Sequence, residues 1–197
     1  IRPKLNNYLR VQDIMILQII EDVIKTRPVY FAVTVAPNNR MGIDEYLEME
    51  GLVYKVTFEK STKDLSMPRL NYNRMIQNIS ETNDYDMIIH GPEEYWNQMN
   101  AVHGIYRYTN LDNPDIYFNE NIQRLIQNYR SSFLQLGLHN LYSSDPDGKA
   151  KTLQLLKMMD NYFPSEVIQT IDAELDIQIG RIYKQAGMPE ELKNRLD

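Results

Sequence analysis

The sequence contains no cysteine among its 197 residues. This absence excludes disulfide bonds, thiolate nucleophiles and zinc–thiolate sites together. The three histidines (His90, His103 and His139) include no pair at the i, i+3 or i+4 spacing of a metal site on one helical face. We therefore expect the protein to hold no metal ion and no cofactor.

Motifs for nucleotide binding and acyl transfer are also missing. The eight glycines form no phosphate-binding loop, no dinucleotide fingerprint and no Gly-x-Ser-x-Gly elbow. The longest apolar run, residues 14–20, is interrupted by Gln18 and is much shorter than the ~20 residues of a membrane-spanning helix. We expect neither a catalytic residue nor a membrane span within this chain, and the absence of an initiator methionine suggests a fragment of a larger protein.

A surplus of positive charge is absent as well. The formal net charge is −6, and no stripe of lysine and arginine carries interleaved aromatic residues, so nucleic-acid binding is not expected. An acidic cluster lies at Asp44, Glu45, Glu48 and Glu50. Its spacing fits no calcium-binding loop, so a solvated helix face is preferred over a cation site.

The first third of the chain predicts a helix, a strand, a short helix and a second strand. Residues 29–35 and 53–58 are rich in β-branched and aromatic types and predict the two strands. The short helix is expected over residues 43–49, with Gly51 in the left-handed conformation that closes it. The first helix, over residues 9–25, has apolar residues every three or four positions, which predicts one buried face formed by Val11, Ile14, Leu17, Ile20 and Ile24.

Helical patterns dominate the rest of the chain. Residues 59–118 are expected to be linker and small helices, one over residues 70–80 and one after the turn at His90. Further helices are expected from residue 119, over 149–162 and 173–186, and from 189, with Gly187 closing the third of them. The predicted fold is α+β and mainly α, with a small two-stranded sheet. We divide it into an N-terminal part, residues 1–118, and a helical part, residues 119–197.

One stretch near the end of the chain has a repeat-like pattern. Ile179-Gly180-x-x-Tyr183-x-x-x-Gly187, followed by a helix beginning at Pro189, resembles the middle of a tetratricopeptide repeat. In such repeats a small residue lets two helices approach closely and a tyrosine fills the gap. The ~34-residue period of true repeats is not kept. A tetratricopeptide-like array of helical hairpins is therefore predicted, with a plain helical bundle as the alternative.

A second resemblance is carried by three ordered segments, which are Leu9–Leu17, Thr26–Ala32 and Gly42–Tyr54. They resemble the region after the last membrane span in a bacterial family of polytopic membrane proteins, catalogued as a domain of unknown function. That family is related to protein O-mannosyltransferase-like glycosyltransferases. A later stretch is similar to the family's tail, which runs into tetratricopeptide-like helices, and includes Asn110–Pro114, Tyr117, Tyr129, Arg130 and Phe133.

This resemblance implies a location and a role. The chain would be a non-catalytic, extracytoplasmic C-terminal domain of a multi-span glycosyltransferase-like protein, at the periplasmic face of the bacterial inner membrane. It would contact the membrane-embedded remainder of the parent chain, where lipid-linked sugar chemistry takes place, and position an acceptor protein or glycan. The residues that match the family, expected to shape packing against that remainder rather than bind sugar, are Arg27, Pro28, Tyr30, Phe31, Gly42, Tyr46, Gly51, Tyr129 and Arg130. The alternative is a stand-alone periplasmic protein-binding module with helical repeats.

Overall fold

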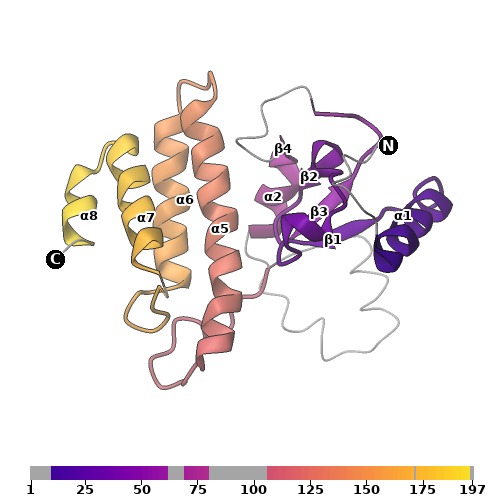
Figure 1. The fold of residues 1–197 in the computed structure, drawn as a ribbon. Helices are drawn as coiled ribbons and strands as arrows, with labels where there is room; N and C mark the ends of the chain where they lie inside the picture. Colours follow the sequence, from indigo (N-terminus) through magenta and orange to yellow (C-terminus); the bar gives the residue numbers. More distant parts are fainter. Residues whose placement is uncertain (1–9, 62–68, 80–105, 171, 196–197) are drawn as a thin grey trace, which may run out of the picture. The chain divides into compact units, whose positions relative to one another are not determined.

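The computed structural model describes residues 10–61, 69–79, 106–170 and 172–195 (Figure 1). The chain divides into two compact units, residues 1–78 and residues 79–197. Among the described residues the fold is α+β and mainly helical, with a four-stranded mixed sheet, and this confirms the predicted fold class. The predicted division at 118/119 stays a prediction, and the helix expected after His90 lies outside the described residues.

Helix α1, Val11–Val23, begins with hydrogen bonds from Arg10 to the side chain of Asp13. The backbone N–H and the guanidinium of Arg10 both donate to the Asp13 carboxylate, at 2.8–3.0 Å. These bonds satisfy a backbone donor at the open end of the helix, and they hold the pKa of Asp13 below its ordinary value. The guanidinium of Arg10 also donates to the Asn39 side chain at 2.9 Å, which ties the start of α1 to a later loop.

The sheet contains four strands, so the prediction of a two-stranded sheet was wrong. The strand order is β1-β3-β2-β4, with β2 parallel to β4 and the other neighbours antiparallel. The helix predicted over residues 43–49 is instead one 3-10 turn, Asp44–Tyr46, followed by a strand. Leu47 and Met49 are both buried, because alternate side chains of a strand point to the same face. The strand bounds are β1 Tyr30–Ala32, β2 Leu47–Met49, β3 Val53–Val56 and β4 Arg69–Leu70.

Gly51 lies in the tight turn between β2 and β3 and closes no helix. Its φ of 100° falls in the left-handed region that favours glycine, and the Glu50 N–H donates to the Val53 carbonyl at 2.9 Å. The prediction of an unusual backbone conformation at this position was correct, whereas its assignment to a helix terminus was wrong.

The core of residues 1–78 is formed between α1 and the sheet. Its buried members are Ile20, Phe31, Met41, Ile43, Leu47 and Val56, and Leu17 and Ile24 pack against them. The predicted buried face of α1 is therefore correct for its C-terminal half. It was wrong for Val11 and Ile14, which are 73% and 53% exposed. Strands of two to four residues present too little surface to cover the whole helix.

In the described part of residues 79–197, four helices of different length lie side by side in chain order (Figure 1). Asn119 caps the first of them, because its side chain accepts a hydrogen bond from the Ile122 N–H at 3.0 Å. Gly187, with φ of 111°, closes the third as predicted. The bounds are α5 Glu120–Tyr142, α6 Gly148–Tyr162, α7 Ala173–Ala186 and α8 Pro189–Asn194, and the helix predicted over residues 70–80 is α2, Tyr72–Ile79.

Glycine lets helices approach closely at two crossings in this unit. A Cβ at Gly180 of α7 would lie 3.0 Å from the Leu192 Cα of α8, and one at Gly137 of α5 would lie 3.2 Å from the Thr152 methyl of α6. The close approach predicted at Gly180 is therefore confirmed. The tetratricopeptide-like assignment itself stays a prediction.

The two glycines are expected to respond differently to alanine. Gly180→Ala places a methyl group against the backbone of α8 and should lower the free energy of unfolding by about 1–3 kcal/mol. Gly137→Ala meets only a side-chain methyl, and the ~1 kcal/mol gained in helix propensity should offset most of its cost. Urea unfolding of both variants measures the difference, and equal losses would contradict the packing described here.

Candidate functional site

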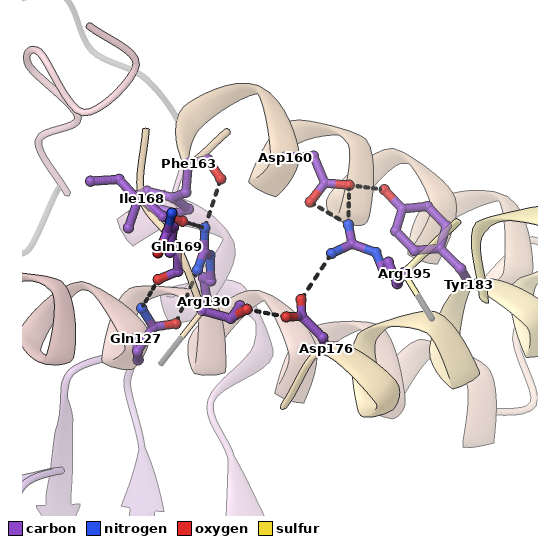
Figure 2. Close-up of polar contacts among 10 residues, drawn as sticks. Gln127, Arg130, Asp160, Phe163, Ile168, Gln169, Asp176, Tyr183 and Arg195 are labelled. Carbon is purple, nitrogen blue, oxygen red and sulfur yellow. Dashed lines mark hydrogen bonds and ion pairs between the residues drawn. The ribbon is translucent and has the colours of Figure 1, made fainter. Parts of the chain in front are cut away.

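Arg130 of α5 lies at the centre of a buried polar cluster (Figure 2). It is 2% exposed, and its guanidinium donates to the carbonyls of Phe163 and Ile168 at 2.8 and 2.5 Å. A third bond, of 3.1 Å, goes to the Gln127 side chain. Burial lowers the pKa of Arg130 to about 10, although nearby Asp160 and Asp176 favour its charged form. Arg130 thus holds the segment that leaves α6 against α5.

A second arginine joins the last three helices. One guanidinium nitrogen of Arg195, Nη2, donates to both carboxylate oxygens of Asp160 of α6, at 2.8 and 2.9 Å, and the other, Nη1, donates to Asp176 of α7 at 3.4 Å. Tyr183 donates its hydroxyl to the same Asp160 carboxylate at 2.6 Å. Hydrogen bonds between ionised groups are stronger than those between neutral groups. Three helices are therefore linked through one carboxylate.

This polar cluster is balanced in charge and is not equipped for proton transfer. Two arginines face two aspartates, and burial together with the bond to Asp160 raises the pKa of Tyr183 well above its ordinary value. Burial alone would lower the pKa of Arg195, but Asp160 outweighs it and raises that pKa. A general acid or base needs a pKa near the working pH. We therefore assign the cluster a structural role.

Tyr129 lies next to Arg130 in an aromatic cluster. Its ring centroid is 4.7 Å from that of Tyr106 and 6.1 Å from that of Phe163, in edge-to-face geometry. Tyr108 and Tyr162 stack nearby at 4.0 Å. Such contacts stabilise a core beyond the area they bury. Tyr129 and Arg130 are thus packing residues of the helical unit.

An open groove of about 550 Å³ lies on the surface of residues 1–78. One wall is the segment after α1, from Ile24 to Pro28, and the other is the segment from Lys55 to Glu59, with Arg69 beyond it. The two walls are held together because the Val56 N–H donates to the Val29 carbonyl at 2.9 Å. Ile24, Pro28 and Val56 supply apolar surface, and Phe58 is 62% exposed. We call this feature the basic groove, because four of its side chains are cationic.

The cations of the basic groove differ in how far they are compensated. Arg69 pairs with Glu48 at 3.0 Å and with Glu59 at 3.5 Å, and Lys55 lies 3.8 Å from Glu50. No carboxylate within the described ranges forms an ion pair with Lys25 or Arg27. The uncompensated positive charge is therefore concentrated at the Arg27-Pro28 end of the groove.

The outward side of α1 is the second surface feature of this unit. Val11, Ile14, Met15 and Ile19 are between 53% and 73% exposed, although all four are large and apolar. They recur at spacings of three and four residues, so they lie on one helical face. We call these four residues the α1 outer face. Single exposed apolar residues are ordinary, but a contiguous group commonly marks an interaction site.

The four carboxylates of the acidic cluster between residues 44 and 50 do not converge on a common point. Asp44 pairs with Arg40 at 2.9 Å and Glu45 with Lys60 at 2.9 Å. Glu48 and Glu50 face the groove cations Arg69 and Lys55. No three acidic or histidine side chains within the described ranges converge as a metal site would require. Each of the four carboxylates faces a different cation. The spacing of residues 44, 45, 48 and 50 in the sequence did not indicate this arrangement.

The nine residues that match the family pattern do not form one site. Arg27 and Pro28 line the basic groove, Tyr30 is exposed on β1 and Phe31 is in the core. Gly42 and Gly51 occupy left-handed turns, and Tyr46 is half-buried against the core. Tyr129 and Arg130 belong to the other unit.

The basic groove and the polar cluster contain six residues that no sequence pattern indicated. They are the groove residues Lys25, Lys55, Phe58 and Arg69, and the cluster residues Asp160 and Arg195.

Removing the Arg130 guanidinium should destabilise the helical unit. Arg130→Met leaves the carbonyls of Phe163 and Ile168 buried without a donor, so we expect a loss of about 2–4 kcal/mol in the free energy of unfolding. Arg124→Met is the matched control, because Arg124 is exposed on the same helix and, among the described residues, pairs only with Glu120. Thermal and urea unfolding measure both. A loss below about 1 kcal/mol at Arg130 would contradict its assigned role.

Comparisons with known proteins bear on the first unit. A model of the family described as TMEM260-associated domain 2 matches residues 2–74. No curated protein and no solved structure matches the chain. No helix of the described ranges combines the length and the apolar character needed to cross a bilayer. TMEM260 is a protein O-mannosyltransferase-like membrane protein, so the match associates residues 2–74 with a glycosyltransferase-like membrane protein. The basic groove and the α1 outer face both lie within these residues.

Proposed function

We propose that this chain is a non-catalytic domain of a multi-span glycosyltransferase-like membrane protein, and that it docks on the membrane-embedded remainder through the α1 outer face. Its place is the extracytoplasmic, periplasmic side of the bacterial inner membrane, where it positions an acceptor protein or glycan. The observation that carries the proposal is the exposure of Val11, Ile14, Met15 and Ile19 within the segment that matches the family.

Physical arguments support a protein partner on this face. A helix that is apolar on most sides is normally buried on most sides. The inner side of α1 packs on the sheet through Ile20 and its neighbours, so the outer side remains for a partner. Gln18 and Asp22 lie on the same exposed side of α1 and are joined by a hydrogen bond of 3.0 Å, and Glu21 lies at its edge. Acidic and neutral polar residues on this side suit a protein surface better than the anionic headgroups of a membrane.

The charge distribution of the described residues supports a non-catalytic role. The carboxylates of the helical cluster, Asp160 and Asp176, are engaged by Arg195, and those near residues 44–50 each face a cation. Sugar transfer and hydrolysis require a carboxylate free to accept or deliver a proton at the reacting bond. In this proposal the catalytic residues for sugar transfer lie in the rest of the parent protein.

The alternative, a stand-alone periplasmic protein-binding module, has one specific observation in its favour. Tyr117 is 87% exposed, and Ile122 and Leu125 are exposed near the start of α5. These exposed side chains would contact a partner protein that binds the helical unit. The two proposals differ in which unit carries the binding surface, and they are separated by variants on α1 and on α5.

We expect the isolated chain to turn over no sugar. The assay offers the purified 197-residue protein radiolabelled activated sugars and lipid-linked sugars, with peptide acceptors, and measures transfer and release. Any turnover that depends on protein concentration would contradict the non-catalytic assignment.

We also expect two substitutions on the α1 outer face to release the chain from its parent. Met15→Glu with Ile19→Glu places two charges on exposed positions, so folding should be preserved while association falls about tenfold or more. The measurement is co-purification of the tagged chain with the separately expressed membrane segment of its parent, and circular dichroism verifies the fold.

Leu125→Glu is the matched control, because Leu125 is an exposed apolar residue on a helix of the other unit. Retained association in the α1 variant would contradict docking through that face. Loss in the Leu125 variant alone would place the docking surface on α5 and contradict the proposed role of α1. Absence of association in the unmodified chain would favour the stand-alone module.

A further inference from the structure

We propose that the basic groove binds an extended, acidic peptide segment that also carries apolar side chains. Carboxylates of the segment pair with Lys25 and Arg27, and an apolar side chain lies against Phe58 and Pro28. The groove and the α1 outer face share no residue, so this inference does not depend on the docking proposed above.

The shape of the groove favours an extended chain. Pockets for small molecules enclose most of the ligand surface, whereas this groove is an open channel between two chain segments. A channel of this kind suits an extended peptide, which rises about 3.3 Å per residue. The wall from Lys55 to Glu59 is ordered locally, because the Thr57 hydroxyl lies 3.0 Å from the carbonyl oxygens of Tyr46 and Glu59 and shares its one proton between them. Pro28 keeps the backbone of Arg27 extended.

The charges favour an acidic ligand. The chain as a whole carries a formal charge of −6, so it repels acidic partners at most of its surface. At the groove four cations gather, and two of them, Lys55 and Arg69, already face carboxylates of the chain. The remaining pair, Lys25 and Arg27, is exposed. A ligand carboxylate placed there gains two favourable partners without displacing an existing ion pair.

A phosphate group or a membrane surface fits less well. Phosphate sites in proteins commonly use the N-terminus of a helix and its backbone N–H groups. Lys25 follows the C-terminal end of α1, where the helix dipole is negative and disfavours a dianion. Glu59, whose side chain is 82% exposed, stands at the other end of the groove and would repel an anionic lipid surface. The apolar floor also requires an apolar side chain from the ligand.

The test uses the full 197-residue chain and a fluorescein-labelled peptide of eight residues in which aspartate alternates with phenylalanine and leucine. Fluorescence anisotropy should report saturable binding that weakens with added salt. The same peptide with asparagine in place of aspartate should bind about tenfold more weakly or worse. Lys25→Gln with Arg27→Gln should lose about tenfold in affinity for the aspartate peptide, and Phe58→Ala should lose several-fold.

Lys149→Gln with Lys157→Gln is the matched control, because both lysines are exposed on α6 of the other unit, and its affinity should not change. Equal binding of the two peptides, or full binding by the Lys25 and Arg27 double variant, would overturn the proposal. Binding of pyrophosphate or of phosphatidylserine vesicles in preference to the aspartate peptide would overturn it too. The α1 variant Met15→Glu with Ile19→Glu should keep peptide binding, so failure here is distinguishable from failure of the docking proposal.

Discussion

The N-terminal unit is governed by a mismatch between a helix and the sheet on which it packs. Helix α1 is apolar on most of its circumference, whereas the sheet consists of four strands of two to four residues. Within the described part of the unit, only the side of α1 that includes Ile20 is covered, and Met15 and its neighbours are exposed. Because exposed apolar area of this kind is unfavourable in water, the unit gains stability from any partner that covers it. An exposed apolar surface of this kind is expected in a domain of a larger assembly, where a partner covers it. In a free monomer the same surface would be unfavourable.

Charge has a different role in the two units. In the helical unit two arginines are turned inward: Arg130 donates to backbone carbonyls, and Arg195 donates to the carboxylates of Asp160 and Asp176. In the first unit most ion pairs are at the surface, where each contributes little to stability. Their effect there is to distribute charge, because they neutralise the acidic stretch and leave Lys25 and Arg27 as a local positive site. Thus the same residue type maintains the fold in one unit and offers recognition in the other.

The parts that could be predicted from sequence are those fixed by local signals. The predicted bounds of the helices in the second unit lie close to the observed ones. Asn119, Gly187 and Pro189 mark helix ends, and apolar residues recur at helical spacing between them. Strand β2 was missed because Leu47 and Met49 are separated by a single acidic residue, Glu48. Over so short a stretch this pattern fits the helical period and the strand period equally. Strand β4 has two residues and no pattern at all. The basic groove could not be predicted, since Lys25 and Phe58 become neighbours only through the pairing of residues 29 and 56.

The position of Arg195 has a consequence for how the helical unit assembles during synthesis. Asp160 precedes its partner Arg195 by 35 positions, so this ion pair cannot form until residue 195 has left the ribosome. Until then α6 and α7 can come together only with a partly buried, unpaired negative charge, which disfavours their final packing. The pairing of α5 with α6 has no such requirement, because Thr152 finds its acceptor at Gly137 earlier in the chain. The helical unit is therefore expected to form in two stages, with translation of its last turn setting the time of the second.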